Sequence, residues 1–170
     1  ANILHMRVLF IIPGEESGNS MIFSKRQYAS VATYCEKSAC FFLKSRTNPL
    51  VLFQEFLRLR KVMKELQPDL IHCHYGTVTS FFSSITNLRP LIITYHGSDL
   101  NFVKNEAYYK EVFRKFLSNL SALRARGIIC VSEPLRKKLW WKKKNALILP
   151  MGVNTDVFEP MDQKKVRAEL

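Results

Sequence analysis

The segment PLIITYHGSDL, residues 90–100, joins two kinds of sequence that a parallel sheet places end to end. Its first half is a short apolar run rich in β-branched residues, which predicts a buried strand. Its second half is small and polar, with His96 and Gly97 followed by Ser98 and Asp99. In open parallel sheets the ligand site lies at the carboxyl ends of the strands. The change of composition at His96 therefore predicts a strand that delivers an imidazole to a ligand.

Similar apolar runs recur on both sides of this segment. We predict strands over residues 7–12, 39–43, 69–75, 90–96, 127–132 and 146–151. The intervening segments carry apolar residues at helical spacing. These predicted helical faces are Tyr28, Val31, Ala32 and Cys35; Leu52, Phe56, Leu59, Met63 and Leu66; and Tyr109, Val112, Phe113, Phe116 and Leu120. Alternating strands and helices predict an α/β fold with a Rossmann-like open, mostly parallel sheet and helices on both faces.

The composition limits the class of protein. The chain has 170 residues, of which 47% are hydrophobic, enough for a domain with a sizeable core. Its net charge of +12 favours anionic partners such as nucleic acid, acidic lipid or phosphorylated sugars. No apolar run approaches the roughly 20 residues of a membrane-spanning helix, and we expect a cytoplasmic location. The four cysteines follow no regular framework, so we expect reduced thiols.

The loop PGEESGNS, residues 13–20, follows the first predicted strand. Gly14 and Gly18 would let backbone amides approach a ligand closely, and the following helix N-terminus favours an anion. The loop contains neither G-x-G-x-x-G nor the P-loop pattern. A plain turn is the alternative interpretation.

The HCH motif at residues 72–74 raises the question of a metal. On a strand, His72 and His74 point to one face and Cys73 to the other, so at most two ligands converge, and we expect no metal. His72 is predicted to be a hydrogen-bonded core residue, while His74, next to Gly76, is a candidate for the cleft.

The run LRKKLWWKKKN, residues 135–145, combines tryptophan with lysine, which is typical of a patch that contacts an anionic membrane surface. A solvated charged face is the alternative. The predicted membrane-contacting residues are Arg136, Lys137, Lys138, Trp140, Trp141, Lys142, Lys143 and Lys144. Such attachment would place the protein on the inner face of the membrane.

Four motifs together resemble a known family. PDLIHCHYG, PLIITYHGSDL, GIICVSEPLRKKL and ILPMGVNTDVFEP, in this order, are similar to the N-terminal domain of a GT-B retaining glycosyltransferase of glycosyltransferase family four. The resemblance spans residues 7–160. It implies sugar transfer with retention from a UDP-, GDP- or similar nucleotide-sugar donor to a saccharide or lipid-linked acceptor, as in cell-surface polysaccharide synthesis. It implies no metal and no cofactor.

The resemblance also implies roles for individual residues. His96 would be catalytic, contacting the transferred sugar and supporting the charge that develops at its anomeric carbon. We expect the residues that bind donor or acceptor to be Gly14, Ser17, Gly18, Asn19, His74, Gly76, Gly97, Ser98, Asp99, Ser132 and Glu133.

The sequence departs from the family in two places. CEKSACFF, residues 35–42, replaces the common Gly-His-Glu-Val type of stretch. The second departure is that the sequence ends at Leu170, where the nucleotide-sugar domain of the family would begin. We expect residues 1–157 to form the N-terminal, acceptor-side domain and residues 158–170 to begin a linker to a C-terminal nucleotide-sugar domain. Without that domain we expect the chain to be inactive.

Two other functions remain open. One is a nucleotide-binding Rossmann module of another enzyme, such as a nucleotide-sugar epimerase or dehydrogenase, although the G-x-G-x-x-G pattern is missing. The other is a basic nucleic-acid-binding module. No recognition motif supports this second alternative, so we expect no nucleic acid partner.

Overall fold

The computed structural model describes residues 4–44, 48–101, 107–152 and 167. These residues form a six-stranded sheet in which every pairing is parallel, with the order β2-β1-β3-β4-β5-β6. The strands are β1 (Leu4–Pro13), β2 (Cys35–Leu43), β3 (Leu70–His74), β4 (Leu91–Tyr95), β5 (Gly127–Cys130) and β6 (Leu147–Ile148). The predicted open parallel α/β fold is confirmed.

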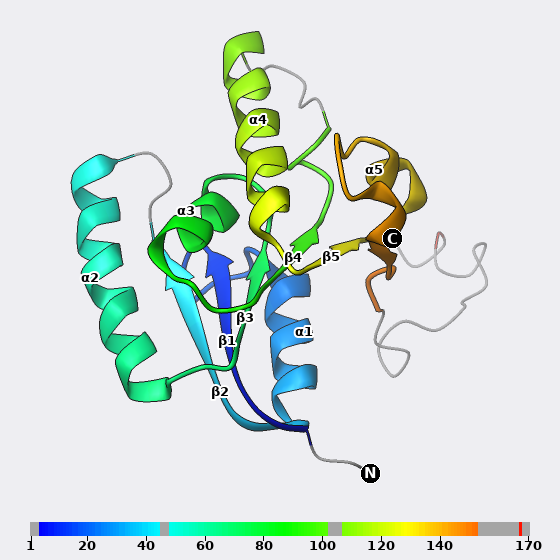
Figure 1. Cartoon of the computed structure of the whole chain (residues 1–170). Coiled ribbons are helices and arrows are strands. Elements are labelled where there is room, and N and C mark those ends of the chain that lie inside the picture. The colour runs from blue at the N-terminus through cyan, green and yellow to red at the C-terminus, as the bar shows by residue number, and fades with distance from the viewer. Residues whose placement is uncertain (1–3, 45–47, 102–106, 153–166, 168–170) are drawn as a thin grey trace.

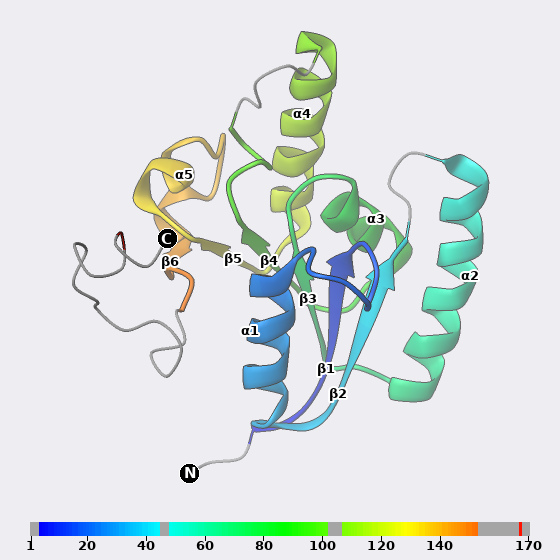
Figure 2. The ribbon, with the colours of Figure 1, turned by 180° about the vertical axis from the view of Figure 1, so that it is seen from behind.

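The helices are α1 (Ile22–Ala32), α2 (Pro49–Leu66), α3 (Val78–Thr86), α4 (Tyr108–Arg124) and α5 (Glu133–Lys137), with a 3-10 turn at Lys143–Asn145. Helix α1 lies on one face of the sheet, and α2 and α3 lie on the other (Figures 1 and 2). Helix α4 packs chiefly against α3 and extends beyond the carboxyl ends of the strands. Because β2 and β3 lie on opposite sides of β1, the strand order reverses between β1 and β3, where sheets of this type bind ligands.

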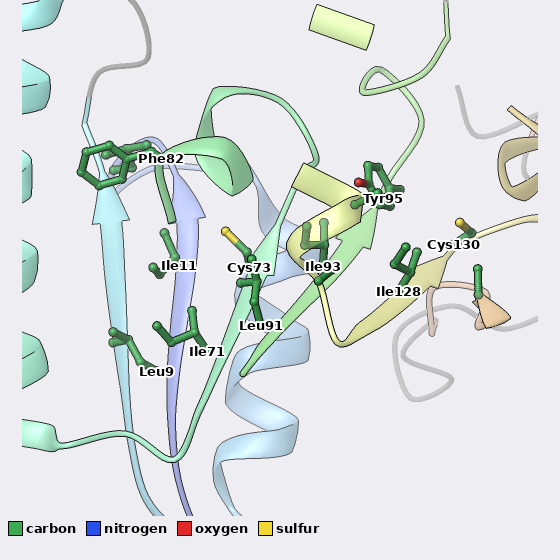
Figure 3. Packing of buried hydrophobic residues seen from close by; sticks show 14 of the residues in the cluster. Leu9, Ile11, Ile71, Cys73, Phe82, Leu91, Ile93, Tyr95, Ile128 and Cys130 are labelled. Atoms are coloured by element: carbon green, nitrogen blue, oxygen red, sulfur yellow. The ribbon is translucent and has the colours of Figure 1, made fainter. Parts of the chain in front are cut away.

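The main core lies between the sheet and the layer formed by α2, α3 and α4. Figure 3 shows Leu9, Ile11, Ile71, Ile93 and Tyr95 pointing to this side from three neighbouring strands. Residues 8–12 of β1 are buried on both faces, as the continuous apolar run predicted. All four cysteines carry free thiols.

Helix α2 begins and ends where its sequence predicts. The side chain of Asn48 accepts hydrogen bonds from the backbone amides of Leu50 and Val51, and Pro49 occupies the first turn. Gln67 ends the helix with a left-handed φ of 47°. Buried Leu59 anchors the helix against the core, so the expected stripe is correctly assigned there.

Four local predictions were wrong or incomplete. Helix α1 ends at Ala32, and Cys35 begins β2 because residues 35–38 pair with the first half of β1. Helix α3 was not predicted. Strand β6 contains only two residues of the predicted 146–151. Of the predicted apolar stripe of α4, Tyr109, Val112, Phe113 and Phe116 are exposed and Leu120 is half-buried.

The predicted domain boundary at residue 157 lies outside the described residues, as does most of the motif at 152–160. Among the helices that the structure describes, none is long and apolar enough to cross a bilayer.

Candidate functional site

Four loops meet at the carboxyl edge of the sheet. Backbone hydrogen bonds tie three of them to a neighbouring strand: Gly14 N donates to Leu43 O, Tyr75 N to Thr94 O, and Val131 N to Tyr95 O. The loops after β1, β3, β4 and β5 are therefore held side by side, across the point where the strand order reverses.

His96, the residue after β4, contacts the end of β3 and helix α1. Its Nε2 lies 3.0 Å from Nδ1 of His74 and 3.5 Å from Oγ of Ser24 in the first turns of α1. The ring of Tyr75 stacks on the His96 ring with centroids 4.4 Å apart. His96 is half-buried, and its ring is fixed by these neighbours.

The histidines form a column of rings beneath the site. His72 stacks on His74 at 4.6 Å between centroids, and His74 lies 5.3 Å from His96. Burial lowers the pKa of His72 to about 4, lowers the pKa of His74 well below its usual range, and lowers the pKa of His96 to about 4. All three imidazoles are therefore neutral at physiological pH.

Each neutral imidazole carries its proton on only one of its two ring nitrogens. In the described part of the chain, His74 Nε2 is buried and has no hydrogen-bond partner. Because an unpaired buried acceptor is tolerated better than an unpaired N–H, we assign the His74 proton to Nδ1, which donates to His96 Nε2. His96 then carries its proton on Nδ1 and is a neutral hydrogen-bond donor at that atom.

Asp99 holds the loops after β3 and β4 together. Its Oδ2 accepts a hydrogen bond of 2.9 Å from the His96 backbone amide, the Gly76 amide lies close enough to favour the charged carboxylate, and Oδ1 has no hydrogen-bond partner among the described residues. Burial raises the Asp99 pKa to about 6, although these amides and nearby Arg114 oppose the rise. Since Asp99 is fully buried, its place in the structure is that of an anchor for His96.

Glycine is required at position 76 by packing. A Cβ at Gly76 would lie 2.0 Å from Cε1 of Tyr95, far inside the limit of contact. Gly97 adopts a φ of +140°, and its carbonyl accepts hydrogen bonds from Leu100 N and Asn101 N. Ser98, in the same turn, is exposed.

The loop after β1 lies over the start of α1. Lys25 Nζ donates to the carbonyls of Glu16 and Gly18 at 2.9 and 3.0 Å, which fixes the loop. Gly14 and Gly18 have φ angles of 102° and 86°. Ser17, Gly18 and Asn19 are exposed, so they are accessible to a ligand.

The remaining predicted residues differ in accessibility. His74 is completely buried, and its Nδ1 contacts His96, which lies closer to the surface. Ser132 precedes α5, where its carbonyl accepts from Arg136 N, and the Glu133 carboxylate pairs with the Arg136 guanidinium at 2.9 Å. Ser132 and Glu133 lie beside the His96 loop through the pairing of β5 with β4.

Three contacts of this site were missed from the sequence: Ser24, Lys25 and Tyr75. Tyr75 is adjacent to His74 and has a φ of 70°, which no simple pattern signals. Ser24 and Lys25 reach the site because α1 begins at the carboxyl edge of the sheet and both residues lie in its first turn (Figure 2).

The HCH motif divides as strand geometry requires. Nε2 of His72 lies 2.8 Å from Oγ1 of Thr94, whereas Cys73 points to the other face and lies 3.1 Å from Oγ of Ser83. Among the residues that the structure describes, no group of three or more His, Cys, Asp and Glu side chains could hold a metal ion.

A separate cavity of about 710 Å³ lies on the α1 side of the sheet. Its walls include Gln27 of α1, Thr94, Ile129 and Met151. None of the predicted site residues lines this cavity.

The basic run at residues 135–145 is divided by the fold. Leu139 is buried and Trp141 is half-buried, with its Nε1 donating to Asn119 O at 2.8 Å. Lys142 Nζ donates to the carbonyls of Leu123 and Ala125. Of the predicted membrane-contacting residues, Lys137, Lys138, Trp140, Lys142, Lys143 and Lys144 are exposed, while Arg136 and Trp141 are not fully so.

Comparison with protein families gives one match. The family described as Glycosyltransferase Family 4 matches residues 22–157. A search by sequence among curated proteins finds no significant match.

Several solved structures share the fold. Sucrose-phosphate synthase from Thermosynechococcus elongatus matches with a TM-score of 0.68 and 13% identity, over 98% of this chain and 53% of that one. HepE from Anabaena, solved with UDP and glucose, matches with a TM-score of 0.61 and 13% identity, over 97% and 50%. UDP-N-acetylglucosamine 2-epimerase from Rickettsia bellii matches with a TM-score of 0.61 and 12% identity, over 86% and 45%. The chain thus spans about half the length of these proteins, and at such identities the likeness shows the fold alone.

Proposed function

The chain belongs to glycosyltransferase family 4, and from this premise we propose that it is the acceptor-side half of an enzyme that transfers a sugar from a nucleotide-sugar donor. The proposed acceptor is a saccharide or a lipid-linked saccharide, transfer retains the anomeric configuration, and the product belongs to a cell-surface polysaccharide. The donor is a UDP-, GDP- or similar nucleotide-sugar. Solved relatives of the same fold include HepE with UDP and glucose and a Neisseria meningitidis epimerase with UDP-GlcNAc, which supports this class of ligand.

The observation that carries the proposal is the placement of His96. A neutral imidazole, fixed by His74 and Tyr75 and anchored through Asp99, lies at the carboxyl edge of the sheet, 3.5 Å from Oγ of Ser24 in α1. Such a group can donate a hydrogen bond to a sugar hydroxyl without adding a positive charge next to an anomeric carbon that itself becomes positive. Fixed dipoles of this kind stabilise a transition state because they need no reorganisation during the reaction.

Buried polar atoms without a partner support a polar ligand or ordered water at this edge. In the described residues, Nε2 of His74, which neighbours His96, and Oδ1 of Asp99, in the turn after it, have no hydrogen-bond partner, and neither has Oγ1 of Thr77 in the loop that follows β3. Unpaired buried polar groups are rare in native proteins and commonly mark such places.

The remaining parts of the proposal concern the whole protein. We propose that a second, nucleotide-sugar-binding domain closes the cleft, that no metal or cofactor takes part, and that the protein acts at the inner face of the membrane through residues 136–144. The matched structures are about twice as long as this chain, which supports a second domain.

The test is a transfer assay on a polypeptide in which this chain is followed by its nucleotide-sugar domain, with a panel of nucleotide-sugars and acceptors. We expect His96→Ala to lower turnover by about 10²-fold or more, the effect of losing one preorganised contact. His5→Ala, in an exposed position, is the matched control. Near-normal turnover of a folded His96→Ala protein would remove His96 from the mechanism. Epimerisation of the donor without transfer would instead favour the nucleotide-sugar epimerase alternative.

A further inference from the structure

Helix α4 buries mostly polar residues and exposes most of its large apolar ones. Its buried residues are Glu111, Ser118, Asn119 and Ser121, together with the apolar Leu117 and Ala122. The opposite side carries exposed apolar side chains, which are Tyr109 (70% exposed), Val112 (45%), Phe113 (60%), Phe116 (46%) and Leu123 (51%). A surface helix of a soluble domain normally shows the reverse arrangement. We call this exposed side of α4, together with Trp140, the α4 face.

Trp140 continues the α4 face beyond the helix. Its ring centroid lies 6.4 Å from that of Phe116, and its side chain is 53% exposed. Its backbone amide donates to Asn119 Oδ1 at 2.8 Å, which holds the basic segment against α4. The aromatic rings of α4 and of the segment after α5 therefore form one surface.

Lysines border this surface. Lys137, Lys138, Lys143 and Lys144 are exposed on the segment that carries Trp140. On α4 itself, partial burial and the neighbouring charges of Lys138 and Arg114 lower the pKa of Lys115, although Glu111 opposes them. Positive charge is thus concentrated next to exposed aromatic rings.

We propose that the α4 face is a docking surface for an anionic lipid bilayer. Aromatic and aliphatic side chains on one side of a helix, bordered by lysines, match a membrane interface, where apolar groups enter the acyl boundary and lysines meet lipid phosphates. Helix α2 also exposes Leu50, Phe53 and Leu57, and exposed basic residues lie on the same helix, so charge alone does not distinguish the two helices. The α4 face is selected by its aromatic rings, because tyrosine, phenylalanine and tryptophan gather there, whereas Phe53 is the only exposed aromatic residue of α2 among the described residues. The proposal extends the membrane attachment proposed above to α4, and it does not depend on the transfer reaction.

The position of α4 gives this docking a consequence for the site. Its N-terminal half extends past the carboxyl ends of the strands in both views (Figures 1 and 2). A bilayer on the α4 face would therefore lie near the edge of the sheet that carries His96.

The test measures partitioning of this 170-residue chain onto vesicles of phosphatidylcholine, with and without phosphatidylglycerol. We expect binding to the anionic vesicles only, weakening at high salt because the charges are screened. Phe113→Ser with Phe116→Ser should lower the partition coefficient at least about tenfold, since two exposed rings no longer enter the membrane. Lys143→Gln with Lys144→Gln should lower it about tenfold at low salt and much less at high salt.

The matched control is Phe53→Ser with Leu57→Ser, which removes two exposed apolar side chains from α2. It should leave partitioning unchanged. An equal loss in this control, or equal binding to neutral and anionic vesicles, would overturn the proposal. Self-association that disappears in the α4 double variant, without vesicle binding, would show that a second copy of the chain occupies the surface instead.

Discussion

Uncharged rings pack around His96, whose Nδ1 we assign as the hydrogen-bond donor in the reaction. His96 rests on His74, His74 on His72, and Phe10 lies 5.2 Å from His72 between ring centroids. The column leads from the interior of the sheet to its edge and carries no formal charge at neutral pH. The proton positions of His74 and His96 are coupled by one hydrogen bond, so a change at buried His74 alters the donor that His96 offers to a ligand.

The same column predicts how stability depends on pH. Unfolded histidines take up protons below about pH 6.5, whereas folded His72 and His96 stay neutral down to about pH 4, so their contribution to the free energy of unfolding falls as pH falls through this window. Asp99 acts in the opposite direction, because its folded pKa of about 6 lies above the unfolded value of about 3.9. Because the pKa is lowered for three histidines and raised for one aspartate, the net effect is that the free energy of unfolding falls as pH falls.

We therefore expect the free energy of unfolding to fall by about 1 kcal/mol per pH unit between pH 6.5 and 4.5, measured by urea denaturation. His72→Gln should flatten this slope, since glutamine can keep the contact with Thr94 but does not titrate. A slope that is zero, or that rises on acidification, would contradict neutral buried histidines.

Gly76 provides a second residue-level prediction. Gly76→Ala should lower the free energy of unfolding by about 3 kcal/mol, because its Cβ would overlap the buried Tyr95 ring. Gly152→Ala is the control, since no described residue lies within 4 Å of a Cβ there, and it should change stability by less than about 0.5 kcal/mol. Similar denaturation curves for the two variants would show that the loop after β3 is loosely packed.

At the level of elements, the two adjacent tryptophans have different environments. Trp141 packs against the core and donates from Nε1 to Asn119 O, whereas Trp140 is exposed on the α4 face. One supports the fold, and the other is available to a partner.

Trp141→Ala should therefore lower the free energy of unfolding by about 2 kcal/mol or more, through lost packing and the loss of the hydrogen bond from Nε1 to Asn119 O. Trp140→Ala should change it by less than about 1 kcal/mol. Thermal and chemical denaturation of both proteins check the difference. A larger loss of stability in Trp140→Ala than in Trp141→Ala would contradict the burial of Trp141 against the core.

The sequence predicted the strands well because apolar runs bounded by turn residues are local signals. The runs at residues 7–12 and 90–96 and the cap at Asn48 are examples. Helix α3 was missed because its hydroxyl-rich sequence, VTSFFSSIT, hides the helical period; Ser80, Ser83 and Thr86 satisfy their hydroxyls by bonding to carbonyls of preceding residues.

Contacts that arise only in the folded chain could not be read from the sequence. An amphipathic pattern predicts a helix but not which side faces inward, and α4 turns its polar side in. At the candidate site, the strand end and its small residues pointed to His96, whereas Ser24 and Tyr75 reach it through tertiary contacts. Cys35 lies in β2 and not in the predicted helix because it pairs with Leu4 of β1.

On the scale of the whole molecule, the candidate site lies at an open edge. The loops after β1, β3, β4 and β5 together form only one side of any cleft, and the chain spans about half the length of the structures it matches. The proposed donor contacts from a second domain would supply the other side.

We therefore expect this 170-residue chain alone to fold, to bind nucleotide-sugars weakly and to transfer no sugar. Millimolar nucleotide should shift its melting temperature little, because a ligand stabilises in proportion to the logarithm of its concentration over its dissociation constant. Calorimetry and a transfer assay on this chain measure both properties. Micromolar donor affinity or turnover would contradict the two-domain proposal and favour a self-sufficient nucleotide-binding module.

The inward polar side of α4 also bears on how firmly this helix is held. Hydrogen bonds attach it: Tyr95 donates its hydroxyl to Ser118 O, Ser118 donates to Asp99 O, and Asn119 accepts from Trp140 and Trp141. Docking of a helix usually draws most of its free energy from apolar burial, and α4 buries only Leu117 and Ala122 fully among its described apolar residues while its aromatic rings stay exposed. Its amides should therefore exchange hydrogen with solvent through local opening at a lower free energy than those of β1. An occupant that covered the α4 face would supply the missing burial and slow that exchange.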